Sequence, residues 1–407
     1  MARIGSIYIG GSEGKTQTGE VFNSGIAFSL ESDSKINKIF TFDNDWEVEV
    51  CQGNQNIVSR CKKNLTIEQI LLTGFELCQK LLDLLSVEKQ LEMNIKSPGD
   101  NYVLLFNNEG KTILRYVDTL DINVSISGVS LVQYDKDGNI IPQPPRPPVN
   151  WVPAFRYYRL SQSSRDLYEA YRNLFLGLES MLSIICPKAR NEGEKKWLLR
   201  ALNEINKKSS LSSLIPENPS DPVAYIIKTQ YDSIRCKLFH AKINSILPYE
   251  TLDPTIVSKA YERLLMVWRQ IAKDYFGVNS EGGVMTYTGF KSIIDAGFKQ
   301  LFVFCATADP SVPTKEDDAI SPSGFPSFIF DENKYEGEIG PGRTLLTGVL
   351  SEALIQMDVI HKVCTQVDSK LISVSHIKDG IYPLGVNMFE NYEILRLVNK
   401  STPKAIF

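Results

Sequence analysis

Arg235-Cys236-Lys237-Leu238-Phe239-His240 lies near the end of the third of four segments with helical periodicity, and these segments fill the middle third of the chain. The 407 residues include only three histidines. An arginine and a histidine separated by four residues supply a permanent positive charge and a group that titrates near neutral pH. A lone histidine is more often a partly buried structural residue or a solvent-exposed residue than a catalytic one. The surroundings of this pair therefore decide its interpretation.

Apolar residues between positions 155 and 276 recur with the 3.6-residue period of an α-helix. They predict helices over residues 163–186, 194–208, 221–239 and 254–276. Asp221-Pro222 and Asp253-Pro254 are typical helix starts, and Gly277 is a typical helix stop. Four helices joined by modest loops favour an antiparallel four-helix bundle.

The two flanks of this region have the period-two patterns of β-strands. Thr66-Ile67-Glu68-Gln69 is a capping-box pattern that opens one helix in the first flank. The proline-rich residues 142–148 predict a stiff linker, and residues 308–326 predict an exposed loop. Predicted strands cover residues 3–9, 21–30, 38–42, 46–51, 102–106, 112–116, 122–126, 129–133, 285–287, 301–306, 327–330, 371–377 and 392–398, with a helix from about 343 to 356 and on towards 365.

The expected fold class is therefore α+β with three domains. Residues 1–150 form a β-rich N-terminal domain with one helix, residues 151–278 a central antiparallel four-helix bundle, and residues 279–407 a β-rich α+β C-terminal domain. Gly10-Gly11-Ser12-Glu13-Gly14-Lys15-Thr16 superficially matches a phosphate-binding loop, but Ile9 stands where its first glycine is required. A glycine-rich hairpin is the better interpretation.

Charge is unevenly distributed along the chain. The net charge is −4, yet residues 151–278 contain 19 Lys and Arg against 13 Asp and Glu. The helical region is thus the expected contact for an anion.

The longest apolar run, residues 173–186, is interrupted by Glu179, and the N-terminus lacks the apolar region of a secretory signal. No membrane span and a cytoplasmic location are expected. The seven cysteines are too widely spaced for CxxC sites and are expected to be reduced thiols.

Arg235 and His240 have the chemistry needed for metal-independent RNA cleavage. A guanidinium group matches phosphate oxygens, and it counters the charge that develops during phosphoryl transfer. A histidine takes a proton from a ribose 2′-hydroxyl or gives one to a leaving 5′-oxygen. The nucleophile comes from RNA itself, so we expect products with 2′,3′-cyclic phosphate ends. We expect no cofactor and no metal ion.

Helix geometry constrains this site. Five residues of an ideal helix rotate by roughly 140° and rise about 7.5 Å, so the two side chains do not converge on one atom from a regular helix. We therefore expect the helix to end near His240, or a two-fold homodimer to bring two such pairs together.

Two further segments carry a resemblance to a known family. Tyr171-Arg172-Asn173-Leu174-Phe175-Leu176-Gly177-Leu178-Glu179 and Leu238-Phe239-His240-Ala241-Lys242 resemble segments of the HEPN superfamily, whose RX4–6H motif is carried here by Arg235 and His240. The likeness covers about residues 155–276, and the segments resemble a branch that includes prokaryotic anti-phage proteins and proteins from methylamine-utilisation neighbourhoods. It implies a homodimeric endoribonuclease, often a toxin or defence effector, that acts on RNA such as tRNA or mRNA.

The remaining candidate residues lie beside this pair. Glu179 is expected to orient Arg235 or His240, with Arg172 and Asp232 in support. Lys237 and Lys242 are expected to contact RNA. Cys236 stands where many active members carry a polar residue, so a non-catalytic binding, scaffold or sensor protein is the alternative. In the ribonuclease, the flanking α+β domains are expected to select substrate, sense a trigger or hold the site inactive, and the sequence does not identify the trigger or a regulatory protein.

Overall fold

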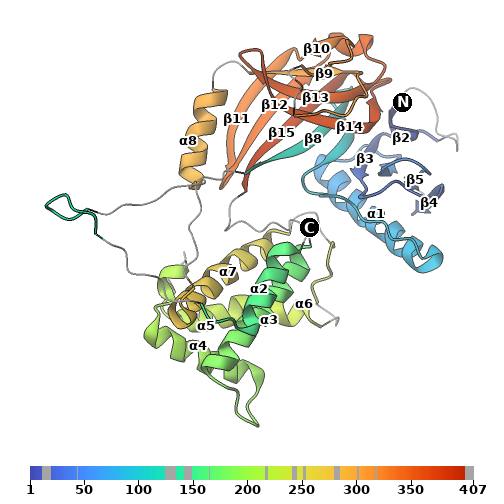
Figure 1. Cartoon of the computed structure of the whole chain (residues 1–407). Helices are drawn as coiled ribbons and strands as arrows, with labels where there is room; N and C mark the ends of the chain where they lie inside the picture. The colour runs from blue at the N-terminus through green and yellow to red at the C-terminus, as the bar shows by residue number, and fades with distance from the viewer. Residues whose placement is uncertain are drawn as a thin grey trace. The chain divides into compact units, whose positions relative to one another are not determined.

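The structure is a computed structural model of the whole chain (Figure 1). It describes residues 1–11, 20–43, 45–123, 134–141, 149–164, 166–215, 219–240, 245–250, 254–278, 285–299, 302–315, 317 and 319–398. The chain divides into two compact units. The first, which we call the sheet unit, comprises Met1–Ile122 and Thr286–Leu397, and the second, the helical unit, comprises Asn123–Met285 and Val398–Phe407.

One sheet of the sheet unit has six strands in the order β10-β9-β13-β14-β1-β2. It joins the first residues of the chain to segments about 300 to 380 residues further on, for example Arg3 in β1 to Tyr382 in β14. The predicted strand over residues 3–9 is a hairpin, because the chain turns at Gly5, whose φ is 55°. The strands are β1 (Ala2–Ile4), β2 (Ile7–Gly10), β9 (Phe302–Thr307), β10 (Ser327–Ile329), β13 (Ile360–Val367) and β14 (Lys370–Tyr382).

The other sheet has nine strands in the order β11-β12-β15-β8-β7-β3-β6-β5-β4. Its neighbours β8 and β15 again come from opposite ends of the sequence (Figure 1). The strands are β3 (Ser24–Ser29), β4 (Lys38–Phe42), β5 (Trp46–Val50), β6 (Asn56–Cys61), β7 (Tyr102–Asn108), β8 (Lys111–Asn123), β11 (Glu332–Gly340), β12 (Arg343–Leu350) and β15 (Met388–Val398).

This strand order corrects the expected fold class. The prediction of separate β-rich domains at the two ends of the chain is wrong, because both sheets contain strands from both ends. The period-two pattern shows which residues of a strand face a core, but it does not show which strand pairs with which.

The helix α1 (Ile67–Lys89) confirms the prediction for the first flank. The Thr66 side chain accepts a hydrogen bond from the backbone N–H of Gln69, and the Gln69 side chain accepts one from the N–H of Thr66. These two bonds form the capping box that starts the helix. Its buried face, which includes Phe75 and Leu81, packs on β3 and β6.

Two predictions for the second flank are wrong. The helix expected from residue 343 is strand β12, in which buried and half-buried residues alternate, followed by a short 3-10 helix, η3 (Ala353–Gln356). The strand expected over residues 285–287 is instead the start of helix α8 (Tyr287–Phe298), where Thr286 accepts a hydrogen bond from the N–H of Gly289. Short apolar runs fit either period, so tertiary packing decides between them.

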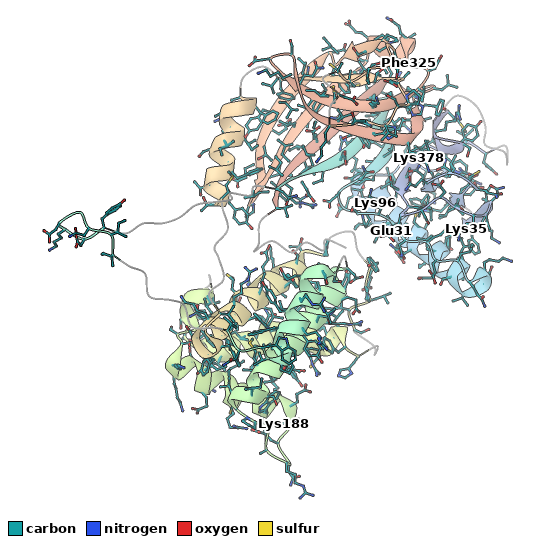
Figure 2. All side chains as sticks on the ribbon, in the orientation of Figure 1. Glu31, Lys35, Lys96, Lys188, Phe325 and Lys378 are labelled. Atoms are coloured by element: carbon teal, nitrogen blue, oxygen red, sulfur yellow. The ribbon has the colours of Figure 1, made fainter. Side chains whose placement is uncertain are left out.

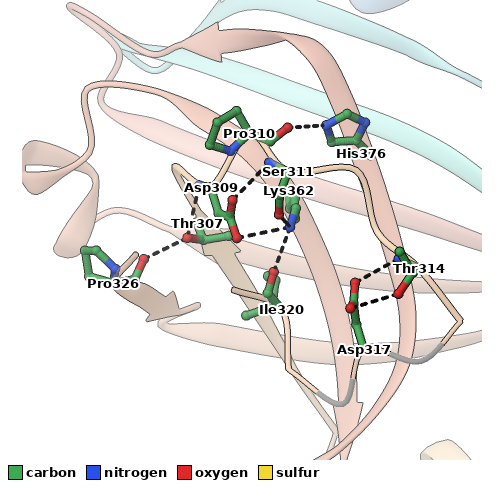
Figure 3. Close-up of polar contacts among 10 residues, drawn as sticks. All are labelled: Thr307, Asp309, Pro310, Ser311, Thr314, Asp317, Ile320, Pro326, Lys362 and His376. Carbon is green, nitrogen blue, oxygen red and sulfur yellow. Dashed lines mark hydrogen bonds and ion pairs between the residues drawn. The ribbon is translucent and has the colours of Figure 1, made fainter. Parts of the chain in front are cut away.

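A buried lysine anchors the loop over residues 308–326 (Figure 3). Lys362 Nζ in β13 lies 3.2 Å from Asp309 Oδ2, 2.8 Å from Ser311 Oγ and 3.1 Å from the backbone oxygen of Ile320. The Lys362 and Asp309 side chains are 1% and 0% exposed. The described residues of this loop form no helix or strand, as predicted, but Asp309, Ser311 and Ile320 are tied to β13 through Lys362.

The helical unit contains α2 (Pro153–Ser163), α3 (Leu167–Ile185), α4 (Glu194–Lys208), a 3-10 turn η1 (Ser212–Leu214), α5 (Pro222–Ile226), a π-helix η2 (Ile227–Arg235), α6 (Cys236–Leu238) and α7 (Thr255–Phe276). The prediction of a regular antiparallel four-helix bundle is wrong. An additional helix, α2, packs on α3, and the expected third helix is divided into α-helical, π-helical and α-helical parts.

Local signals nevertheless gave several helix ends correctly. The limits of α4 match the prediction, Asp221 caps α5, and Gly277 ends α7 with a φ of 70°. Close packing of α3 depends on Gly177, where a Cβ would lie 3.0 Å from the Trp268 ring nitrogen and 3.2 Å from Tyr157 Cβ.

Several predictions fall outside the described residues, namely residues 12–16 of the glycine-rich segment, most of the strand over 122–126, the strand over 129–133 and the proline-rich tract over 142–148. In the described part of the chain, no helix is both long and apolar enough to cross a membrane.

Candidate functional site around Arg235

Arg235 is the last residue of the π-helix η2. The chain enters this segment through α5, which is fixed by the hydrogen bond from the N–H of Ala224 to the Asp221 side chain. Within η2, the Ser233 hydroxyl donates to the backbone oxygen of Lys228, five residues earlier, at 2.8 Å. π-helical turns are rare in proteins, and those that do occur are often found at functional sites.

Two carboxylates from other helices hold the guanidinium group of Arg235. Its Nη2 contacts Glu194, the first residue of α4, and lies 3.5 Å from Glu179 Oε1 in α3. The Arg235 side chain is 12% exposed, and the rings of Tyr231 and Phe239 lie 5.3 and 5.0 Å from its Cζ. Both ion pairs use Nη2, whereas Nε is buried and has no hydrogen-bond partner among the described residues. The guanidinium is therefore fixed in position with part of its donor capacity unused.

The two carboxyl groups interact with each other as well as with Arg235. The pKa of Glu179 is raised to about 7, first by burial and then by a hydrogen bond with the Glu194 carboxyl, while Arg235 acts in the opposite direction. Two carboxyl groups that share a hydrogen bond need one proton between them. Glu194 Oε2 also accepts a hydrogen bond from the Tyr231 hydroxyl at 3.3 Å. The site thus contains a carboxyl pair that gains or loses a proton near neutral pH.

His240 lies in a bend two residues beyond α6, and its side chain is exposed. The prediction that the helix ends near this histidine is confirmed. Arg172 in α3 supports the bend, because its Nη2 donates to the backbone oxygen of Leu238 at 2.9 Å. Between Arg235 and His240 themselves, both of which are described, the structure records no hydrogen bond.

The structure therefore brings together some of the predicted site residues and separates others. Glu179 meets Arg235, and Arg172 meets the segment that leads to His240. Asp232 instead pairs with Lys195 at 2.7 Å on an exposed surface.

The two predicted RNA-contacting lysines have different outcomes. Lys237 is exposed on α6, so its ammonium group is accessible to an anion. Lys242 lies outside the described residues.

Sequence reasoning missed the second carboxylate and the aromatic residues around the guanidinium. Glu194 is 41 residues from Arg235 in sequence. The sequence indicates only an acidic residue in the first turn of a helix, where the helix dipole stabilises a negative charge. Tyr231, four residues before Arg235, and Phe239, four residues after it, have the spacing of helix neighbours, which was a usable signal.

Comparison of the chain with protein-family models, with curated proteins and with solved structures finds no match. Across the described residues, no group of three or more His, Cys, Asp or Glu side chains is arranged to hold a metal ion.

Proposed function

We propose that the helical unit binds RNA and cleaves it by attack of a ribose 2′-hydroxyl on the adjacent phosphate. The observation that carries this proposal is the arrangement around Arg235, a fixed and largely buried guanidinium whose two ion pairs both use Nη2, followed five residues later by an exposed histidine. A phosphate oxygen accepts hydrogen bonds from the face of the guanidinium that Glu194 and Glu179 do not occupy.

In this mechanism His240 takes the proton from the 2′-hydroxyl, and the imidazolium so formed, or that of the second copy in the dimer, delivers a proton to the departing 5′-oxygen. The 2′-oxygen forms a bond to phosphorus as the bond to the 5′-oxygen breaks, so the products end in a 2′,3′-cyclic phosphate and a 5′-hydroxyl. Arg235 counters the charge that develops on the phosphate oxygens, and protonation of Glu179 reduces competition for the guanidinium. Lys237, exposed on α6, adds a contact for the RNA backbone.

A homodimer completes the proposed site. In one chain Arg235 and His240 are not joined by a hydrogen bond, and a two-fold axis beside η2 would place the histidine of one copy near the arginine of the other. Such a nuclease fits a role as a toxin or anti-phage effector in the cytoplasm, where its RNA substrates are present.

A second function is favoured by one specific observation, the engagement of Arg235 by two carboxylates. An arginine already neutralised in this way positions helices and does not need to bind a phosphate. In this alternative, the helical unit is a non-catalytic binding or sensor module.

An RNA-cleavage assay distinguishes the two functions. The full-length protein is incubated with total tRNA and with mRNA in EDTA, beside the Arg235→Ala and His240→Ala variants. We expect cyclic phosphate ends from the unaltered protein and a loss of rate of about 100-fold or more in each variant. Lys188→Ala is the matched control, since it removes one positive charge from an exposed position of the same unit (Figure 2). RNA that is bound but never cleaved, under conditions in which both variants fold and form dimers, would favour the non-catalytic module.

A further inference from the structure

The sheet unit contains a cavity of about 280 Å³ that is independent of the proposed RNA site. Its walls come from both sheets, with Ile4 and residues 376–379 from the six-stranded sheet and Ala27, Tyr116 and Arg396 from the nine-stranded sheet. Lys96 and Lys378, which also line it, are labelled in Figure 2. At about 30 Å³ per water molecule, the space corresponds to about nine waters, which is enough for a small polar ligand.

Two carboxylates of the cavity wall are held by uncharged donors. Asp379 accepts hydrogen bonds from the backbone N–H of Gln55 at 2.7 Å and from Asn56 Nδ2 at 2.8 Å, both at Oδ2. Asp118 accepts from Asn101 Nδ2 at 2.9 Å and from the hydroxyl of Ser375. Oδ1 of Asp379 has no partner among the described residues, so an oriented acceptor remains for a ligand.

The other carboxylates of the wall are neutralised within the protein. Arg396 lies 2.8 Å from Asp100 and 2.7 Å from Asp121, and both pairs are built into the wall. Asp100 is only 7% exposed as a side chain, so this part of the wall is rigid.

Two flexible donors complete the wall. Lys96 is exposed, and its ammonium group makes no ion pair or hydrogen bond within the described part of the chain. The side-chain amide of Gln55 is likewise uncommitted among those residues. The cavity thus presents a carboxylate acceptor, Oδ1 of Asp379, beside amide and ammonium donors, with apolar contributions from Ile4, Ala27, Val103 and Ile377.

This mixture selects the chemical class of the ligand. An anion would face the carboxylates of Asp118 and Asp379, and an apolar molecule would leave Oδ1 of Asp379 without a hydrogen bond. Adjacent hydroxyl groups both donate and accept, so they satisfy the carboxylates and the donors together without a net charge. We propose that this cavity binds a small neutral polyhydroxylated molecule through a vicinal diol, either a free sugar or the ribose of a nucleoside.

Calorimetric titration of the full-length protein tests the proposal, with D-ribose, D-glucose and adenosine as probes. We expect saturable binding of at least one probe, and binding of adenosine without ribose would identify a nucleoside site. The matching 2-deoxy compound, 2-deoxyribose or 2′-deoxyadenosine, should bind about ten-fold more weakly because one hydroxyl is missing. If no probe binds, or if the deoxy compound binds equally well, the proposal is wrong.

Variants of the wall separate specific binding from adventitious binding. Lys96→Ala and Gln55→Ala remove side chains that make no hydrogen bond or ion pair among the described residues, and each should weaken binding by about ten-fold. Asp379→Asn should weaken it further, with thermal unfolding as a check of its fold. Lys35→Ala, an exposed lysine outside the cavity, is the matched control and should leave affinity unchanged. Unchanged affinity in the Lys96, Gln55 and Asp379 variants would place the ligand elsewhere and overturn the assignment.

Discussion

Arg235 and Glu179 are 56 residues apart in sequence, yet Arg235 Nη2 lies 3.5 Å from Glu179 Oε1 in the interior of the helical unit. Glu194 contacts the same nitrogen. One guanidinium therefore links η2 to α3 and α4, while the pKa of Glu179 stays near 7 because burial and Glu194 outweigh the positive charge. Stability and any chemistry of this site depend on the same three charged groups.

Removal of the guanidinium should expose the repulsion between the two carboxyl groups. We expect Arg235→Met to lower the free energy of unfolding by about 3 kcal/mol, because two half-buried carboxyl groups lose their cation. Adding Glu194→Gln should restore part of this loss. Urea unfolding followed by tryptophan fluorescence measures both, since Trp151, Trp197 and Trp268 all lie in the helical unit. Equal stability of the single and double variants would contradict the electrostatic explanation.

Arg172 should act on cleavage through the bend that carries His240. Its hydrogen bond to the backbone oxygen of Leu238 orders the end of α6, so Arg172→Ala should lower the rate of RNA cleavage by about ten-fold. RNA affinity should change much less, because this arginine is assigned no phosphate contact. The test is kcat and KM for one oligonucleotide, with Lys188→Ala as the control. A loss confined to KM would instead indicate a direct contact with RNA.

Glu393 should make the stability of the sheet unit depend on pH. Thr365 and Ser373 donate to this carboxyl at 2.8 and 2.9 Å, and burial raises its pKa to about 7 from 4.5. The folded state holds the proton more tightly than the unfolded state, so the stabilisation is present below about pH 4.5 and is lost as the pH rises through 7. The difference corresponds to about 3 kcal/mol.

Hydrogen–deuterium exchange of β13 and β15 at several pH values, corrected for intrinsic rates, measures this dependence. Glu393→Gln keeps the shape of the side chain but cannot ionise, so protection of these strands should become nearly constant between pH 5 and 8. A variant that retains the full pH dependence would show that another group is responsible.

Lys362 should be essential for the sheet unit because it is the cation of a fully buried pair. Lys362→Met leaves Asp309 buried without its ion-pair partner, and we expect a loss of about 3–5 kcal/mol. The same substitution at Lys334, which is 70% exposed and pairs with Glu336 at the surface, should change stability by about 0.5 kcal/mol or less. Thermal unfolding compares the two. Similar melting temperatures for both variants would contradict the role assigned to Lys362.

Local signals in the sequence determined the ends of several helices. The capping box at Thr66 and Gln69, the Asp221 cap and the Gly277 stop each act within one turn of chain, so the residues that cause them are visible in sequence. The helical period also separated the middle of the chain from its flanks. The position of His240 beyond a helix end was predicted for the same local reason.

Only the tertiary structure decided which segments lie together. The alternating pattern of β15 does not indicate that this strand lies between β12 and β8. The apolar residues of β12 are compatible with a helix, and hydrogen bonds to neighbouring strands are what make this segment a strand. The π-helical turn that presents Arg235, and the meeting of this arginine with Glu194, likewise depend on packing between helices. Capping and periodicity are interactions over a few residues, whereas strand pairing and buried ion pairs join residues that are distant in sequence. The sequence alone therefore determined the helical region and several helix ends, and tertiary contacts determined the sheets, the strand conformation of β12 and the site.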